Sequence, residues 1–205
     1  MSFFIGTYTV RAKSYCHHQF FNNFRTIVKN NPACIVDSTP GMRYARQLTI
    51  ESNRIPRCEF IHQDIPDKAG YFFHNSVAGG VNLCRDRFLK TDAKYLLIIE
   101  SDVIPPVDVL ERMQKDILQL ENKNWGILGA LYYNGFHNYE LTGLQESDCV
   151  LSGCTVYRRE LLQSHPFRWS LENVKAFPDA WMSHDAFLAG YSKWNDHDIR
   201  CAHIK

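Results

Sequence analysis

The sequence has no marked excess of charge of either sign. Its 205 residues include 23 Lys and Arg and 22 Asp and Glu, which gives a formal net charge of +1. A balance this even provides no general argument for a nucleic-acid or acidic-membrane partner, although it leaves local basic patches open. The length is that of one ordinary or slightly large domain. We therefore expect a single domain over residues 1–205.

Long apolar runs and paired cysteines are also missing. Nowhere do about 18 apolar residues follow one another, and residues 1–6 lack the basic and apolar regions of a signal peptide. The seven cysteines are an odd number without the spacing of a disulfide framework or of paired zinc ligands. Reduced thiols are typical of the cytosol. We expect a soluble, cytoplasmic protein with no membrane insertion.

Motifs of several common enzyme classes are absent from the sequence. It has no Walker A loop, no G-x-G-x-x-G fingerprint and no G-x-S-x-G elbow, so nothing favours a P-loop nucleotidase, a dinucleotide-binding oxidoreductase or an α/β-hydrolase. We also find no internal repeat and no low-complexity segment. Function must therefore be inferred from the residues that are present.

Short apolar runs alternate with longer amphipathic segments along the chain, which is typical of a βαβ sheet. Helical spacing of buried positions is clearest at Val77, Val81, Cys84 and Phe88. We expect loops over residues 132–147 and 158–177. Strands are predicted at residues 3–5, 33–36, 58–62, 95–99, 125–132 and 150–157, with helices around residues 20–28, 77–88 and 110–120.

Two carboxylates follow the apolar strand predicted at residues 95–99. Tyr95 to Ile99 carry no charge, and Glu100 and Asp102 come directly afterwards. Ligands of open α/β sheets bind at the carboxyl ends of strands, and residues two apart on a strand point the same way. Both carboxylates are then placed to face one cation, for which oxygen ligands favour Mg²⁺ or Mn²⁺. The alternative is that the acids only mark the end of the strand.

The order of several motifs resembles that of glycosyltransferases of the GT-A fold, particularly the family 2-like group. The most specific block is Ser152-Gly153-Cys154, followed by Arg159-Glu160. The other matching segments are residues 4–9, 35–39, 98–102, 177–185 and the Cys-x-His at 201–203. The resemblance implies an α/β fold with a mixed, mainly parallel sheet flanked by helices. It also implies transfer of a sugar from a nucleotide-diphosphate sugar to an acceptor hydroxyl, with inversion of configuration.

The resemblance also implies a divalent metal, Mn²⁺ or Mg²⁺. Asp102 would be its direct ligand, and His203 a further ligand that suits Mn²⁺ somewhat better. Glu100 would hold the donor ribose or reach the metal through water. The family has Asp where this chain has Glu100, which puts direct coordination by Glu100 in doubt. The alternative for His203 is a solvated side chain near the C-terminus.

For the base that deprotonates the acceptor, the resemblance implies Asp185. The family usually has Glu-Asp where this chain has His184-Asp185, so only the second acid matches, and His184 could orient the acceptor or donor. The alternative is that Asp185 is a first-turn acid that complements the helix dipole.

The resemblance also implies contacts to the donor nucleotide. They lie at the ends of the first two strands and on the helix that precedes the strand at residues 95–99. We expect Asp37 to accept hydrogen bonds from the base, and a uridine diphosphate sugar is the first choice of donor. Asp37 could instead be a turn residue, and Arg85 an exposed helical arginine. The residues expected to contact the donor are Thr7, Tyr8, Asp37, Arg85, Glu100 and Ser101.

The acceptor is left open as a glycan, a small molecule, a protein or a modified DNA base. A DNA acceptor would suit the basic residues between the second and third strands, which are Arg43, Arg46, Arg54 and Arg57. The aromatic residues of the 132–147 loop could stack on a sugar or base, or simply pack; they include Tyr132, Tyr133, Phe136 and Tyr139. A catalytically silent domain of the same fold is the remaining alternative, because Glu100 and His184 depart from the family pattern.

Overall fold

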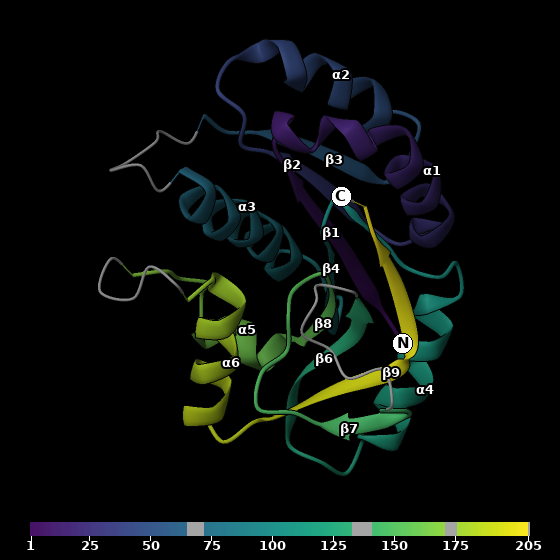
Figure 1. The fold of residues 1–205 in the computed structure, drawn as a ribbon, viewed down its shortest axis with the longest axis vertical. Coiled ribbons are helices and arrows are strands. Elements are labelled where there is room, and N and C mark those ends of the chain that lie inside the picture. The colour runs from purple at the N-terminus through teal and green to yellow at the C-terminus, as the bar shows by residue number, and fades with distance from the viewer. Residues whose placement is uncertain (65–71, 133–140, 171–175, 205) are drawn as a thin grey trace.

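The computed structural model describes residues 1–64, 72–132, 141–170 and 176–204 (Figure 1). Its strands form a sheet in the order β3-β2-β1-β4-β8-β6-β9-β5, with β7 also paired to β9. The strands are β1 (Phe3–Thr9), β2 (Ala33–Asp37), β3 (Cys58–His62), β4 (Tyr95–Ile99), β5 (Val103–Ile104), β6 (Trp125–Tyr132), β7 (Leu144–Glu146), β8 (Cys154–Arg158) and β9 (Ser192–His203).

Helices cover both faces of this sheet. They are the 3₁₀ helix η1 (Arg11–Cys16) and the α-helices α1 (His17–Val28), α2 (Met42–Ser52), α3 (Phe72–Leu89), α4 (Val109–Gln119), α5 (Arg159–Ser164) and α6 (Pro178–Leu188). None of the helices in the described ranges is long and apolar enough to cross a bilayer.

One half of the sheet is parallel and the other is mixed. β3, β2, β1 and β4 run parallel to one another, whereas β8 is antiparallel to both β4 and β6. Every residue of β1 and β2 is buried. Parallel strands of this kind read as continuous apolar runs because helices exclude water from both faces.

Neighbouring residues of the central strands enter two separate cores. Phe3, Ile5 and Leu97 pack with α1, α2 and α4, whereas Phe4 and Leu96 pack with α3, α5 and α6. This follows from the alternation of side chains along a strand. In Figure 1, α3, α5 and α6 accordingly lie on one side of the sheet, with α1 and α4 on the other.

Most predicted elements are confirmed. The strands predicted at residues 58–62, 95–99 and 125–132 have the observed bounds, and the helical positions of α3 predicted from spacing are all buried. The last predicted strand begins at Cys154 rather than Val150, because Ser152 and Gly153 form a turn before it.

The two predicted loops are wrong in part. β7 lies within residues 132–147 and α5 lies within residues 158–177. Both elements are too short to produce a periodic pattern, since β7 has three residues and α5 has six. The aromatic residues Tyr133, Phe136 and Tyr139 lie outside the described residues.

Candidate functional site

The site is built at the carboxyl end of β4, where the apolar strand gives way to acids. Leu96, Leu97, Ile98 and Ile99 have no exposed surface; all four pair with β8, and the first three also pair with β1. The pairing continues for one residue, because the Glu100 amide donates to the carbonyl oxygen of Gly153 at 2.9 Å. The first acid is thereby fixed at the point where the parallel strands end.

Asp102 is positioned by a turn and not by the strand. The strand ends at Ile99, and the Val103 amide closes a turn by donating to the Glu100 carbonyl oxygen at 3.0 Å. Alternation along one strand, which the sequence analysis gave as the reason that the two acids point the same way, is therefore wrong. The acids still converge, because Asp102 Oδ1 lies 2.9 Å and Glu100 Oε2 lies 3.6 Å from one ammonium, that of Lys13.

Lys13 is the main residue of the site that the sequence did not indicate. It lies on η1, directly after β1, and its amide donates to the Val10 carbonyl oxygen at 2.9 Å. The Cys16 sulfur lies 2.9 Å from the carbonyl oxygens of both Lys13 and Ser101, so the two share its single S–H donor and this turn contacts the one that carries Asp102. Burial lowers the pKa of Lys13, but Glu100 and Asp102 outweigh it and the net shift is upward. The ammonium is therefore charged at neutral pH.

The second oxygen of Glu100 is occupied by two hydroxyl groups. Tyr8 donates to Oε1 at 2.7 Å and Ser152 donates to the same atom at 2.6 Å. Burial raises the pKa of Tyr8, and the negative charge of Glu100 raises it further, so Tyr8 remains a neutral donor. Glu100 thus connects β1 with the turn before β8.

His203 is brought to Asp102, as predicted, but it does not complete a set of metal ligands. Its Nε2 lies 3.4 Å from Asp102 Oδ2, and the Ile204 amide donates to the Asp102 carbonyl oxygen at 2.9 Å. Within the described residues, no three His, Cys, Asp or Glu side chains are grouped so that they could hold one ion. With both Asp102 oxygens engaged by Lys13 and His203, the residues as arranged fit an ammonium better than a divalent metal.

Asp179 is a further acid of the site that the sequence analysis did not single out. It lies in the first turn of α6, where its Oδ2 accepts from the Ser152 amide at 3.2 Å and its Oδ1 from the Ala180 amide at 2.8 Å. Burial raises the pKa of this carboxyl, and the negative charge of Glu100 adds to the rise. Burial and the nearby charge of Glu100 therefore both increase the affinity of the Asp179 carboxylate for a proton.

Asp185 occupies a different environment. The alternative that it is a first-turn acid is wrong, because α6 begins at Pro178 and Asp185 is its eighth residue. Arg168 donates to Asp185 from Nε, at 2.9 Å from Oδ2, and from Nη2, at 2.7 Å from Oδ1. The guanidinium carbon of Arg168 lies 4.0 Å from the centre of the Trp181 ring. The hydrogen bonds from Arg168 lower the pKa of Asp185. His184 is exposed and borders, with Trp181, a hollow of about 340 Å³ that is also lined by Ala176 and Ala180.

Asp37 is predicted to bind the nucleotide base, but both of its carboxylate oxygens contact other residues of the chain. Its Oδ1 accepts from the Thr39 amide at 2.9 Å, and its Oδ2 lies 2.9 Å from His62 Nδ1. The carboxylate is fully buried. In this arrangement it fixes the turn after β2, which is the turn-residue alternative recognised in the sequence.

The remaining predicted donor contacts are separate from this network or lack hydrogen-bond partners. Arg85 donates from Nε to the Leu162 carbonyl oxygen at 2.6 Å, so it binds the C-terminal end of α5. The hydroxyls of Thr7 and Ser101 are buried and have no hydrogen-bond partner in the described part of the chain. The structure thus brings Tyr8, Glu100, Asp102 and His203 together with Lys13, and Arg85 interacts elsewhere.

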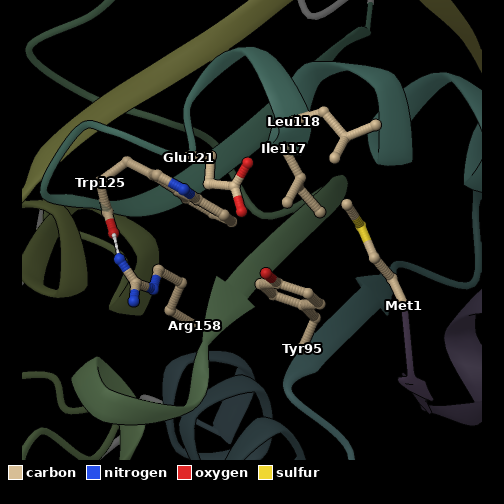
Figure 2. Close-up of a pocket in the computed structure, with 7 residues that line it drawn as sticks. All are labelled: Met1, Tyr95, Ile117, Leu118, Glu121, Trp125 and Arg158. Carbon is tan, nitrogen blue, oxygen red and sulfur yellow. Dashed lines mark hydrogen bonds between the residues drawn. The ribbon is translucent and has the colours of Figure 1, made fainter.

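A second hollow lies at the opposite end of β4 (Figure 2) and encloses about 130 Å³. Tyr95 and Trp125 stack on each other there with ring centres 5.8 Å apart, and Arg158 donates to the Trp125 carbonyl oxygen at 3.3 Å. A five-residue strand spans about 15 Å, so this hollow is distant from Glu100. It is lined by Met1, Tyr95, Ile117, Leu118, Glu121, Trp125 and Arg158.

Comparisons with known proteins identify the fold. No protein-family model and no curated protein match the chain. Among solved structures, S. aureus TarS 1–349 in complex with UDP-GlcNAc superposes with a TM-score of 0.69 at 15% identity over 100% of this chain. The mannosyltransferase PcManGT from Pyrobaculum calidifontis, in complex with GDP-Man and Mn²⁺, superposes over 98% of this chain with a TM-score of 0.67 at 16% identity. The chain has the GT-A fold.

This confirms the predicted fold class, a mixed, mainly parallel sheet flanked by helices. The chain spans 59% of the TarS structure and 56% of PcManGT. A197 from STIV is nearer in size: the chain covers 86% of it, with a TM-score of 0.55 at 14% identity. Identities this low establish the fold alone, and the family 2-like assignment stays a prediction.

Proposed function

We propose that this chain transfers a sugar from a nucleoside diphosphate sugar to an acceptor hydroxyl, with inversion at the anomeric carbon. The observation that carries the proposal is the convergence of Glu100 and Asp102 on one cationic group, at the carboxyl ends of parallel strands. Ligands of such sheets bind at this edge. The proposal is supported by neighbours of the same fold whose structures contain UDP-GlcNAc or GDP-Man.

The chemistry explains why a cation is needed at this position. The leaving group is a nucleoside diphosphate, and its negative charge grows as the glycosidic bond breaks. Positive charge held in place beforehand stabilises such a transition state. The sequence predicts Mn²⁺ or Mg²⁺ on Asp102 and His203 for this role, and the PcManGT structure contains Mn²⁺. The contacts of Lys13 favour a different source of charge, an ammonium of the chain itself.

The acceptor must lose its proton to a base as it attacks. Asp185 is the base that the sequence predicts, but Arg168 binds both of its oxygens and lowers its pKa. Asp179 lies beside the Glu100 network, and its pKa is raised. A general base functions best when its pKa approaches the working pH. Both Asp179 oxygens accept only from neutral backbone amides, whereas those of Asp185 accept from a charged guanidinium, so the surroundings favour Asp179 as the base, with Asp185 holding Arg168 against Trp181.

The experiment that tests the proposed function is a ligand screen by thermal shift. UDP, GDP and their sugars are added to the wild-type protein and to Asp102→Ala, with and without Mn²⁺. A ligand at about 100 times its Kd stabilises a protein by about 2.7 kcal/mol, or roughly 5–10 °C at this size. We expect one nucleotide series to raise the Tm of the wild type and not of the variant.

No response to any nucleotide under any condition would contradict the proposal. A response without turnover on any acceptor would instead support the silent-domain alternative. The donor base is expected to be uracil, as the sequence predicts.

A modified DNA base as acceptor is the second candidate, and one observation favours it. The four arginines between β2 and β3 are all exposed, and Arg43 and Arg46 lie on the solvent face of α2, opposite its buried residues. Neutralisation of phosphates by such residues makes binding fall steeply with salt. Retention on duplex DNA at low salt that is no stronger than on a neutral polymer would exclude this acceptor.

A further inference from the structure

Lys13 occupies the place at which the two acids of the site converge. Its side chain is 12% exposed, and the side chains of Glu100 and Asp102 are 17% and 9% exposed. The ammonium is therefore largely shielded from solvent, and two acceptors from a different part of the chain surround it. A lysine that merely solubilised η1 would point into water, as the exposed Arg11 of the same helix does.

The turn that carries Lys13 is held at several points, so the ammonium is placed before any ligand binds. The Arg11 amide donates to the Thr39 hydroxyl at 2.7 Å, and the Cys16 sulfur lies 2.9 Å from the Ser101 carbonyl oxygen. Lys13 also lines a small hollow between β1 and α3, together with Tyr8 and Ser76. Tyr8 is one of the residues that the sequence predicts to contact the donor.

A divalent metal at Asp102 would have to compete with this ammonium. Asp102 Oδ1 accepts from Lys13, and Glu100 Oε1 already accepts from two hydroxyls at 2.6 and 2.7 Å. A metal at the same place would meet like-charge repulsion from the ammonium and would have to displace Lys13 from Asp102 Oδ1. An ammonium has three N–H donors, so one group can bind carboxylate and phosphate oxygens together.

We propose that Lys13 supplies the positive charge that binds the diphosphate of the donor, and that nucleotide binding by this chain does not require a divalent metal. This rests on the proposed function and names the group that recognises the nucleoside diphosphate. Asp102 and Glu100 then act as positioning residues that fix the ammonium. No bond is made or broken in this step, which is binding alone.

The test is calorimetric titration of UDP and GDP in EDTA and in Mn²⁺, using the wild type, Lys13→Met and Lys13→Arg. Met keeps the apolar stem and removes the charge, and Arg keeps the charge. Arg11→Met is the matched control, because Arg11 is an exposed cation two residues away on the same helix. Circular dichroism checks that each variant is folded.

We expect wild-type and Arg11→Met proteins to bind one nucleotide with a Kd that changes less than about twofold between EDTA and Mn²⁺. Lys13→Met should weaken binding in EDTA by about tenfold or more, the effect of losing a charged hydrogen bond. Mn²⁺ should restore part of that loss, because the carboxylates are then available to it. Lys13→Arg should keep most of the metal-free affinity, and it serves as the test if Lys13→Met does not fold.

The titrations distinguish failure of the role of Lys13 from failure of the proposed function. Wild-type binding that appears only with Mn²⁺, or a Lys13→Met variant that binds as well as wild type in EDTA, would overturn the role of Lys13 and leave the proposed function standing. Absence of nucleotide binding in both buffers would overturn the proposed function, and this proposal with it.

Discussion

The role of Glu100 in the site follows from the residues that contact its two carboxylate oxygens. One carboxylate oxygen accepts hydrogen bonds from Tyr8 and Ser152, and the other faces Lys13. The longer side chain of Glu, compared with Asp, allows it to join elements on both sides of β4. Asp102 is shorter, follows a turn and makes the closest contact with the ammonium, at 2.9 Å.

At the scale of single residues, the prediction concerns which acid is the general base for the acceptor. Asp179→Asn should lower kcat by about 10²–10⁴-fold, the usual contribution of a general base, because the amide cannot take the acceptor proton. Asp185→Asn should have a smaller effect, within about tenfold, because its carboxylate is engaged by Arg168. Steady-state kinetics of both variants measure the difference. A larger loss in Asp185→Asn would instead establish Asp185, the acid that the sequence predicts.

At the scale of elements, the close packing of α3 on β1 keeps Tyr8 in place. A Cβ added to Gly80 would lie 2.8 Å from Tyr8 Cβ, closer than such atoms approach in proteins. Gly80→Ala should therefore cost about 1–3 kcal/mol through overpacking, and after the gain of about 1 kcal/mol in helix propensity the net destabilisation should be up to about 2 kcal/mol. Urea denaturation measures the change. Unchanged stability would mean that α3 can shift away from β1 at little cost.

Elements were predictable where their apolar residues recur regularly, whereas β9, the longest strand with 12 residues, was not predicted because charged and polar residues interrupt its apolar positions. The residues Val77, Val81, Cys84 and Phe88 form the buried stripe of α3, as their spacing indicates. Short elements produce no such pattern. β7 forms because β9 offers it a partner, with Leu144, Gln145 and Glu146 opposite Asp196, Asn195 and Trp194. Its position depends on long-range pairing that local spacing cannot reveal.

For the molecule as a whole, one buried acid pair makes stability depend on pH. Asp116 of α4 is 6% exposed and Asp196 of β9 is 7% exposed. Burial, and then the charge of Asp196, raise the pKa of Asp116 to about 7 from its ordinary value of 3.8. The folded state consequently holds a proton that the unfolded state releases. Between about pH 4 and 7 this lowers the free energy of unfolding as pH rises.

Asp116→Asn should remove this contribution. The variant should gain stability relative to wild type as pH rises from about 4 to about 7, and the difference should be constant above that range. Denaturation midpoints at several pH values measure it, and Asp108→Asn, an exposed acid next to the same helix, is the control. A difference that does not vary with pH would contradict a shared proton.

The sequence by itself determined the fold class, most strands, the helical faces and the location of Glu100 and Asp102. These follow from local patterns, because apolar runs and spacing record which faces a segment buries. Only the tertiary structure decided that Lys13 contacts both of these acids, that Asp179 and Glu100 both accept hydrogen bonds from Ser152, and that Asp37 and Arg85 are bound within the chain. Lys13 and Asp102 are 89 positions apart, and their contact depends on strand order, register and a turn. No local pattern contains that information.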